Sequence, residues 1–153
     1  MEQPFRKIAV AVDGSSFAAR ALDFGEDLAS KYGAELILIN VVGVPGNFGE
    51  LTPTMSSRVD SVLQSYLTDN KKQAMDWMNG AVTAAKAKGI NANSEVIEGD
   101  NSVVEAITNY AREKQIDLLI VGTRGKSAFK KLILGSIAAG VVSHANCPVL
   151  VVR

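Results

Sequence analysis

The sequence has 153 residues, of which 47% are hydrophobic and 21% are charged. This length predicts one domain, residues 1–153, whose core needs no disulfide or metal, and the composition excludes a disordered chain. No apolar run approaches the roughly 18 residues of a membrane-spanning helix, and the start MEQPFRK has no signal-peptide pattern. We therefore expect a cytoplasmic protein that does not associate with membranes.

The charges balance in total but not along the chain. There are 16 basic and 16 acidic residues, yet Leu118 to Arg153 holds five basic residues and no acidic one. This local excess suggests an anion site, whereas a nucleic-acid surface usually makes a whole domain basic. A chance acid-free stretch is the alternative. The single cysteine, Cys147, and the single histidine, His144, cannot build a zinc cluster.

The first third of the chain predicts a strand, a helix and a second strand. The apolar run KIAVAV (7–12) predicts a buried strand that ends at the turn Asp13-Gly14-Ser15-Ser16. Apolar residues at helical spacing from Ala18 to Tyr32 predict a helix, which Gly33 ends. The run ELILINVV (35–42) is apolar at both alternating positions, as is typical of a strand covered on both faces.

The middle of the chain predicts a loop, a long helix and a short strand. Residues 43–57 contain three glycines and two prolines without a period, which indicates a loop. Residues 58–88 have apolar positions at helical spacing and predict a helix that Gly89 ends, with a break near Asp69-Asn70 as an alternative. Residues 93–97 predict a strand.

The last third alternates in the same way. Ser102 and Glu105 form a capping box that opens a helix. Strands are predicted at 117–121 and 148–152, with a helix through Ile137 and His144 between them. Strict alternation of two-sided apolar strands with helices predicts an α/β fold with a parallel sheet. Ligands of such sheets bind beyond the carboxyl ends of the strands, where the strand order reverses.

The segment GTRGKSAFKKLILGS, which starts at Gly122, carries the functional prediction. Gly122 and Gly125 allow a ligand to approach the backbone, and Gly135-Ser136 opens a helix whose N–H groups favour a phosphate. Arg124, Lys126 and Lys130 add cations; taken singly, each glycine also fits an ordinary turn or kink. A P-loop is excluded, because its first glycine would fall on Ile120, and the dinucleotide pattern G-x-G-x-x-G is absent.

Two glycines separated by two residues, then nine residues, then Gly-Ser, resemble the ATP-binding signature of the universal stress protein family. KIAVAVDGSSFAARAL, IDLLIVGTRG and HANCPVLVVR are similar to the same family, so the resemblance covers essentially the whole chain. It implies a three-layer αβα fold with an open five-stranded parallel sheet of order 3-2-1-4-5, Rossmann-like and similar to the adenine nucleotide alpha-hydrolase fold.

The resemblance also implies a binding site. Asp13 would accept hydrogen bonds from ribose hydroxyls, Val41 would meet adenine through its backbone, and Ser136 with Ile137 would make the second phosphate contact. The family often has proline at the position of Ala11 and histidine at that of Arg124, and neither change argues against binding. The full set of expected residues is Ala11, Asp13, Val41, Val121, Gly122, Thr123, Arg124, Gly125, Lys126, Ser127, Gly135, Ser136 and Ile137.

The implied function is a regulatory, stress-response protein that binds ATP, with or without Mg²⁺, and does not bind nucleic acid. Such proteins form homodimers, here through the edge strand Pro148–Arg153. Two alternatives remain at this point. One is a slow ATPase, for which Asp13 is the only acidic residue near the predicted phosphates; the other is a protein-interaction module without nucleotide, against which the intact glycines count. We expect no catalytic residue and no protein-bound metal.

Overall fold

The computed structural model describes residues 2–13, 16–43, 53–99, 102–123 and 134–153, and of residues 16–17 and 53–60 it describes the backbone alone. Strands and helices alternate along the chain, as the sequence predicts. Their bounds are β1 (Lys7–Ala11), α1 (Ser16–Tyr32), β2 (Glu35–Gly43), α2 (Pro53–Ala87), β3 (Ala92–Gly99), α3 (Val103–Glu113), β4 (Leu118–Gly122), α4 (Ser136–His144) and β5 (Val149–Val152).

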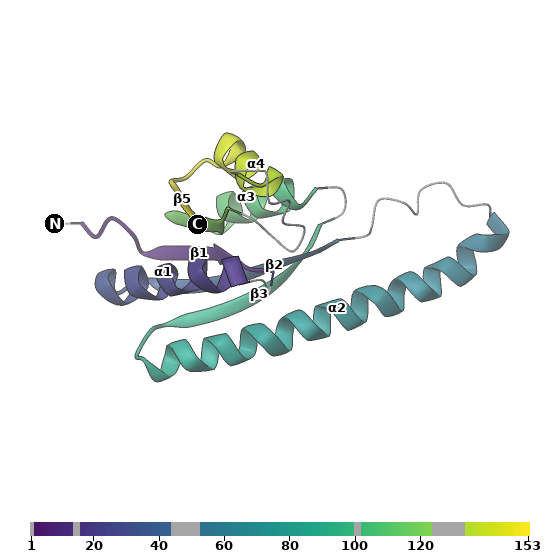
Figure 1. Ribbon diagram of the computed structural model, residues 1–153, viewed down its shortest axis with the longest axis horizontal. Helices are drawn as coiled ribbons and strands as arrows, with labels where there is room; N and C mark the ends of the chain where they lie inside the picture. Colours follow the sequence, from purple (N-terminus) through teal and green to yellow (C-terminus); the bar gives the residue numbers. More distant parts are fainter. Residues whose placement is uncertain (1, 14–15, 44–52, 100–101, 124–133) are drawn as a thin grey trace.

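The five strands form one parallel sheet in the order β3-β2-β1-β4-β5. This order confirms the predicted 3-2-1-4-5 arrangement. Helices α1 and α2 lie on one face of the sheet, and α3 and α4 lie on the other (Figure 1). The fold is therefore the three-layer αβα arrangement that the sequence analysis predicted.

Alternate residues of the central strands supply the two apolar cores. On β2, Leu36 and Leu38 belong to the cluster that includes the buried residues of α1 and α2, whereas Ile37 and Ile39 belong to the cluster under α3 and α4. Successive strand residues point to opposite faces, so a fully apolar run such as ELILI buries both of its sides.

Helix α1 lies close to the sheet because its buried stripe is made of small residues. At Gly25, an added Cβ would come within 2.6 Å of Val10 Cγ2 and 3.2 Å of Leu36 Cδ1. Two other glycines end helices as predicted: Gly33 and Gly89 follow α1 and α2 with φ of +63° and +82°, a conformation that side chains with a Cβ disfavour.

The prediction for the second helix is corrected in two ways. The predicted loop 43–57 is wrong from Pro53 onward, because α2 begins there; proline suits the first turn of a helix, where its missing N–H costs no hydrogen bond. The alternative of a break near Asp69-Asn70 is also wrong, since α2 is continuous for 35 residues. Residues 44–52 lie outside the described residues.

Helix α2 is far longer than the strands it covers. At about 1.5 Å per residue it spans about 52 Å, while the nine residues of β2 span about 30 Å. Its amino-terminal half therefore extends past the carboxyl end of the sheet (Figure 1). Strand β3 is longer than the predicted 93–97, because it pairs with β2 from Leu36↔Ala92 to Gly43↔Gly99. In the described ranges no helix is both long enough and apolar enough to span a bilayer.

Candidate functional site

The strand order reverses at β1, which lies between β2 and β4. The chain leaves β1 toward α1 on one face and leaves β4 toward α4 on the other (Figure 1). Such a switch point opens a crevice beyond the carboxyl ends of the strands, and ligands of open parallel sheets bind there. The residues that follow β1 and β4 are those that the sequence analysis singled out.

The expected nucleoside-contacting residues gather at this end of the sheet. Ala11 pairs with Ile39, so Val41 lies two residues further along the neighbouring strand. Ala11, Val41 and Val121 all pack with the apolar cluster on the α3 and α4 face, while Asp13, two residues beyond β1, is half-buried. The structure therefore brings Ala11, Asp13, Val41 and Val121 together at the carboxyl end of the sheet.

A backbone hydrogen bond joins the end of β4 to the start of α4. The N–H of Gly135 donates to the carbonyl oxygen of Thr123 at 2.6 Å, and the N–H of Thr123 donates to the carbonyl of Val152 at 2.8 Å. Thr123 is buried, with 6% of its surface exposed. Gly122-Thr123 and Gly135-Ser136, which are separated by the basic segment in the sequence, are therefore neighbours in space.

The amino end of α4 is suited to an anion. Gly135 is the N-cap, with an extended backbone at φ −65° and ψ 157°, and as a glycine it has no side chain to accept from the first helical N–H groups. Its carbonyl accepts from the N–H of Ala139 at 3.0 Å, so the helix begins at Ser136. Uncapped N–H groups and the helix dipole favour a negative charge at this position.

Four of the predicted phosphate-loop residues, Arg124, Gly125, Lys126 and Ser127, lie outside the described residues, as does Lys130. The described ends of that loop are Thr123 and Leu134. Ile137, in the first turn of α4, has 42% of its surface exposed.

The structure adds a residue that the sequence analysis did not name. The Nδ2 of Asn40 donates a hydrogen bond of 2.7 Å to the carbonyl oxygen of Val12, one residue before Asp13. Its only signal in the sequence is a polar residue inside the apolar run ELILINVV. Such a residue needs a partner when it is partly buried, and here the partner belongs to the neighbouring strand end.

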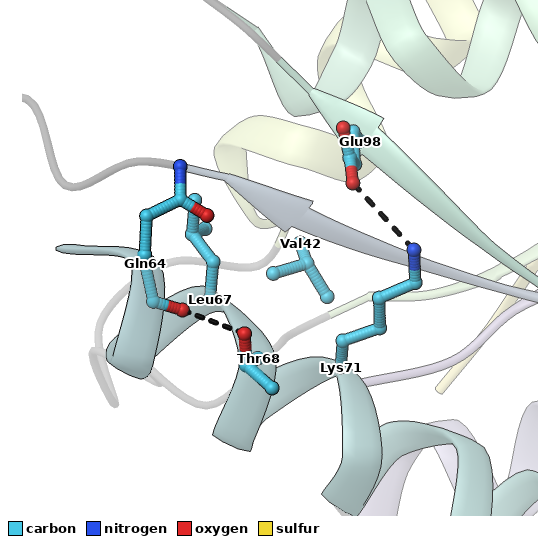
Figure 2. A pocket seen from close by; sticks show the side chains of 6 residues that line it. All are labelled: Val42, Gln64, Leu67, Thr68, Lys71 and Glu98. Atoms are coloured by element: carbon cyan, nitrogen blue, oxygen red, sulfur yellow. Dashed lines mark hydrogen bonds and ion pairs between the residues drawn. The ribbon is translucent and has the colours of Figure 1, made fainter. Parts of the chain in front are cut away.

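A separate depression lies on the face of the sheet that α1 and α2 cover. It has a volume of about 220 Å³ and lies between α2 and the ends of β2 and β3 (Figure 2). Lys71 Nζ is 3.6 Å from Glu98 Oε1 across it, and Thr68 Oγ1 donates to the carbonyl of Gln64. Val42 and Leu67 complete the lining. None of the nine expected site residues that the structure describes lines this depression, so it is distinct from the site expected at the ends of β1 and β4.

Cys147 and His144 are placed without catalytic partners among the described residues. Burial of the Cys147 thiol raises its pKa, and the nearby Asp117 carboxylate raises it further. The thiolate is therefore disfavoured, which is the opposite of what a nucleophile requires. The Nδ1 of His144 lies 2.8 Å from the carbonyl oxygen of Gly140 on its own helix. Within the described ranges no group of three or more His, Cys, Asp or Glu side chains is arranged to hold a metal ion.

A parallel αβα sheet of this strand order, with its switch point between β1 and β4, defines the Rossmann-like class of α/β proteins. The model of the universal stress protein family matches residues 4–153 of the chain. This protein therefore belongs to the universal stress protein family.

Individual relatives agree with this assignment. The chain is 33% identical to Universal stress protein YxiE of Bacillus subtilis, over 97% of this chain and 99% of the relative. It is similar to the solved structure of UspA from Lactobacillus plantarum, with a TM-score of 0.85, 26% identity and coverage of 97% and 98% of the two chains.

More distant solved members carry adenine nucleotides. One is the universal stress protein of Archaeoglobus fulgidus in complex with dAMP, with a TM-score of 0.65, 22% identity and coverage of 97% and 98%. Another is a universal stress protein in complex with cAMP, with a TM-score of 0.57, 23% identity and coverage of 97% of each chain. At these identities the likeness to this chain is one of fold.

Proposed function

We propose that this universal stress protein binds ATP at the carboxyl ends of β1 and β4 and acts as a nucleotide-dependent regulatory protein in the stress response. The observation that carries the proposal is the hydrogen bond from Gly135 to Thr123. It brings the glycine-capped amino end of α4 next to Gly122 and Thr123 at the end of β4, which supports a shared phosphate site.

The described residues fit the parts of an adenine nucleotide. The uncapped N–H groups at Ser136 and Ile137 would bind phosphate oxygens, with the helix dipole favouring their charge. Asp13 would accept hydrogen bonds from the ribose hydroxyls, and the backbone of Val41 would hold the base. Arg124, Gly125, Lys126 and Ser127 belong to the proposal through the sequence motif alone. Mg²⁺, when bound, would be held by the phosphates, because the described residues offer no cluster of carboxylates for it.

Support also comes from family members of the same fold that were solved with dAMP or cAMP. Both ligands share with ATP an adenine and a sugar that carries a 5′-phosphate, the sugar of dAMP being deoxyribose. The triphosphate is the part of ATP that the basic segment after Gly122 would distinguish. Five basic residues and no acidic one between Leu118 and Arg153 favour the ligand with the larger negative charge.

In this proposal the protein acts as a homodimer, in which the β5 strands of the two copies pair with each other. Strand β5 is at one edge of the sheet and pairs with β4 in the described structure. Its residues Val149, Leu150 and Val151 remain half-buried, and an apolar edge strand with unpaired backbone groups is a template for a second strand.

Equilibrium dialysis with labelled ATP tests the proposal directly. We expect saturable binding by the wild-type protein. The substitution Asp13→Ala should weaken it by roughly tenfold or more, the typical effect of losing hydrogen bonds to a charged group. Asp76→Ala, on the exposed surface of α2, is the matched control and should bind like the wild type. No binding at millimolar ATP would end the proposal, and hydrolysis lost in Asp13→Ala with binding retained would instead favour an ATPase.

A further inference from the structure

The β1–β2 ladder ends in a side-chain hydrogen bond at the proposed nucleotide site. The backbone pairing of these strands stops at Ala11↔Ile39. One residue further, the N–H of Val12 still donates to the carbonyl of Ile39 at 2.8 Å, but the carbonyl of Val12 accepts from the side-chain amide of Asn40 at 2.7 Å. The Asn40 side chain thus donates to the Val12 carbonyl oxygen, which is the acceptor that the next backbone bond of the ladder would use.

The register identifies which backbone group this replaces. The N–H of Glu35 donates to Arg6 on the β1 side, and the N–H of Leu36 donates to Asn91 on the β3 side. In a parallel ladder these directions alternate, so the N–H of Val41 turns toward β1 and the next acceptor in line is the carbonyl of Val12. Among the described residues no hydrogen bond joins Val41 N–H to that carbonyl, which Asn40 holds instead.

The same contact fixes the peptide that leads to Asp13. The carbonyl of Val12 and the N–H of Asp13 belong to one planar peptide group, so holding the oxygen holds the plane. Val12 is therefore fixed at both ends by successive residues of β2, at its N–H by Ile39 and at its carbonyl by Asn40. The backbone direction at Asp13 follows from this arrangement.

We propose that Asn40 is a positioning residue of the nucleotide site, which leaves the N–H of Val41 available to the base and orients Asp13 toward the ribose. The inference rests on the proposed function. Asn40 itself acts through Val12, and it is half-buried on the strand next to the site. The ligand it serves is a nucleoside, because both groups it positions belong to the nucleoside half of the site.

Amide hydrogen exchange of the wild-type protein tests the ladder without any substitution. We expect the Val41 amide to exchange faster than the Ile39 amide, whose N–H lies inside the ladder, and to become protected when ATP is added. A Val41 amide that is as protected as that of Ile39 before ATP is added would overturn the inference. So would a Val41 amide that ATP leaves unprotected while ATP binds.

ATP affinity tests the positioning. Asn40→Ala removes the donor, and Asn40→Asp keeps the shape of the side chain without an N–H; each should weaken ATP binding by roughly fivefold to tenfold. The control is Asn93→Ala, which removes a similar amide bond of 2.6 Å to Glu35 at the amino end of the sheet. Wild-type affinity in whichever Asn40 variant folds would overturn the inference alone. No ATP binding by the wild type would overturn the proposed function as well.

Discussion

The N–H of Gly135 and the carbonyl oxygen of Thr123 form a 2.6 Å hydrogen bond that closes the segment between β4 and α4. Thr123 in turn donates to Val152, the last residue of β5. The glycine at the amino end of α4, the end of β4 and the end of the edge strand β5 are therefore connected by two consecutive backbone bonds. This connection places the proposed phosphate site beside the proposed dimer strand.

The substitution Gly135→Pro tests the importance of this closure. Gly135 has φ −65°, which proline also adopts, so the substitution chiefly removes the N–H donor. We expect the free energy of unfolding to fall by about 1 kcal/mol, the usual value of one hydrogen bond, and ATP affinity to fall with it. Urea denaturation and equilibrium dialysis measure the two effects. Gly135→Ala keeps the N–H and is the control; equal stability of the two variants would contradict the prediction.

Most of the fold follows from the sequence because its signals are local. These signals are the apolar runs of the strands, the helical spacing of apolar residues, the helix-ending glycines Gly33 and Gly89, and the Ser102 cap. Each acts over a few residues and each is confirmed; for example, Ser102 Oγ accepts from the N–H of Glu105 at 3.2 Å. The start of α2 was missed because Pro53 reads equally as a loop residue or as the first turn of a helix.

The alternative of a helix break near Asp69-Asn70 is wrong for an energetic reason. Asp and Asn are weak helix formers that cost only about 0.5 kcal/mol each relative to good ones. Burial of Met78 and partial burial of Ala74 against the sheet stabilise the helix on the carboxyl side of this pair, so packing outweighs propensity.

The candidate site was predictable in part. Its glycines and Asp13 have a motif, whereas Asn40 has none, because its partner Val12 is 28 positions away in the sequence and becomes a neighbour only through strand pairing. The register that turns the Val41 N–H toward β1 is likewise a property of the assembled sheet.

Removal of one outward N–H from β5 tests the proposed dimer. The N–H of Leu119 donates to Pro148 and that of Thr123 donates to Val152, so by alternation the N–H of Val151 points away from β4. Val151→Pro therefore spares the bonds to β4 and removes one that a partner strand would use. We expect a shift from dimer to monomer in sedimentation velocity. Val142→Ser, on the exposed side of α4, is the control; dissociation by that variant alone would place the interface on the helix.

The close approach of α1 to the sheet makes Gly25 sensitive to an added methyl group. A Cβ there would lie 2.6 Å from Val10 Cγ2 and 3.2 Å from Leu36 Cδ1, and both of these side chains are buried in the core. We expect Gly25→Ala to lower the free energy of unfolding by about 1–3 kcal/mol through overpacking. Gly80→Ala is the matched control, because a Cβ at that exposed helical position meets nothing within 4 Å. It should raise stability by up to about 1 kcal/mol, and similar losses in both variants would contradict the packing argument.

Tyr110 gives the protein a pH dependence in the alkaline range. Its hydroxyl donates to Glu95 Oε2 at 2.7 Å, and only 7% of the residue is exposed. Burial raises the pKa of the phenol above its ordinary value, and the hydrogen bond and charge of Glu95 raise it further. The folded state therefore keeps the phenolic proton at pH values where an unfolded tyrosine, with a pKa of about 10, loses it.

The consequence for stability has a definite sign. Above about pH 10 the unfolded state binds fewer protons than the folded state, so the free energy of unfolding falls as pH rises. Urea denaturation between about pH 8 and about pH 11 should show this loss in the wild type and a smaller loss in Tyr110→Phe, which has no phenol to ionise at that position. Tyr66→Phe removes a tyrosine that is 47% exposed, leaves Tyr110 intact and should keep the loss. If Tyr110→Phe followed the wild-type pH profile, other groups would account for the alkaline loss of stability.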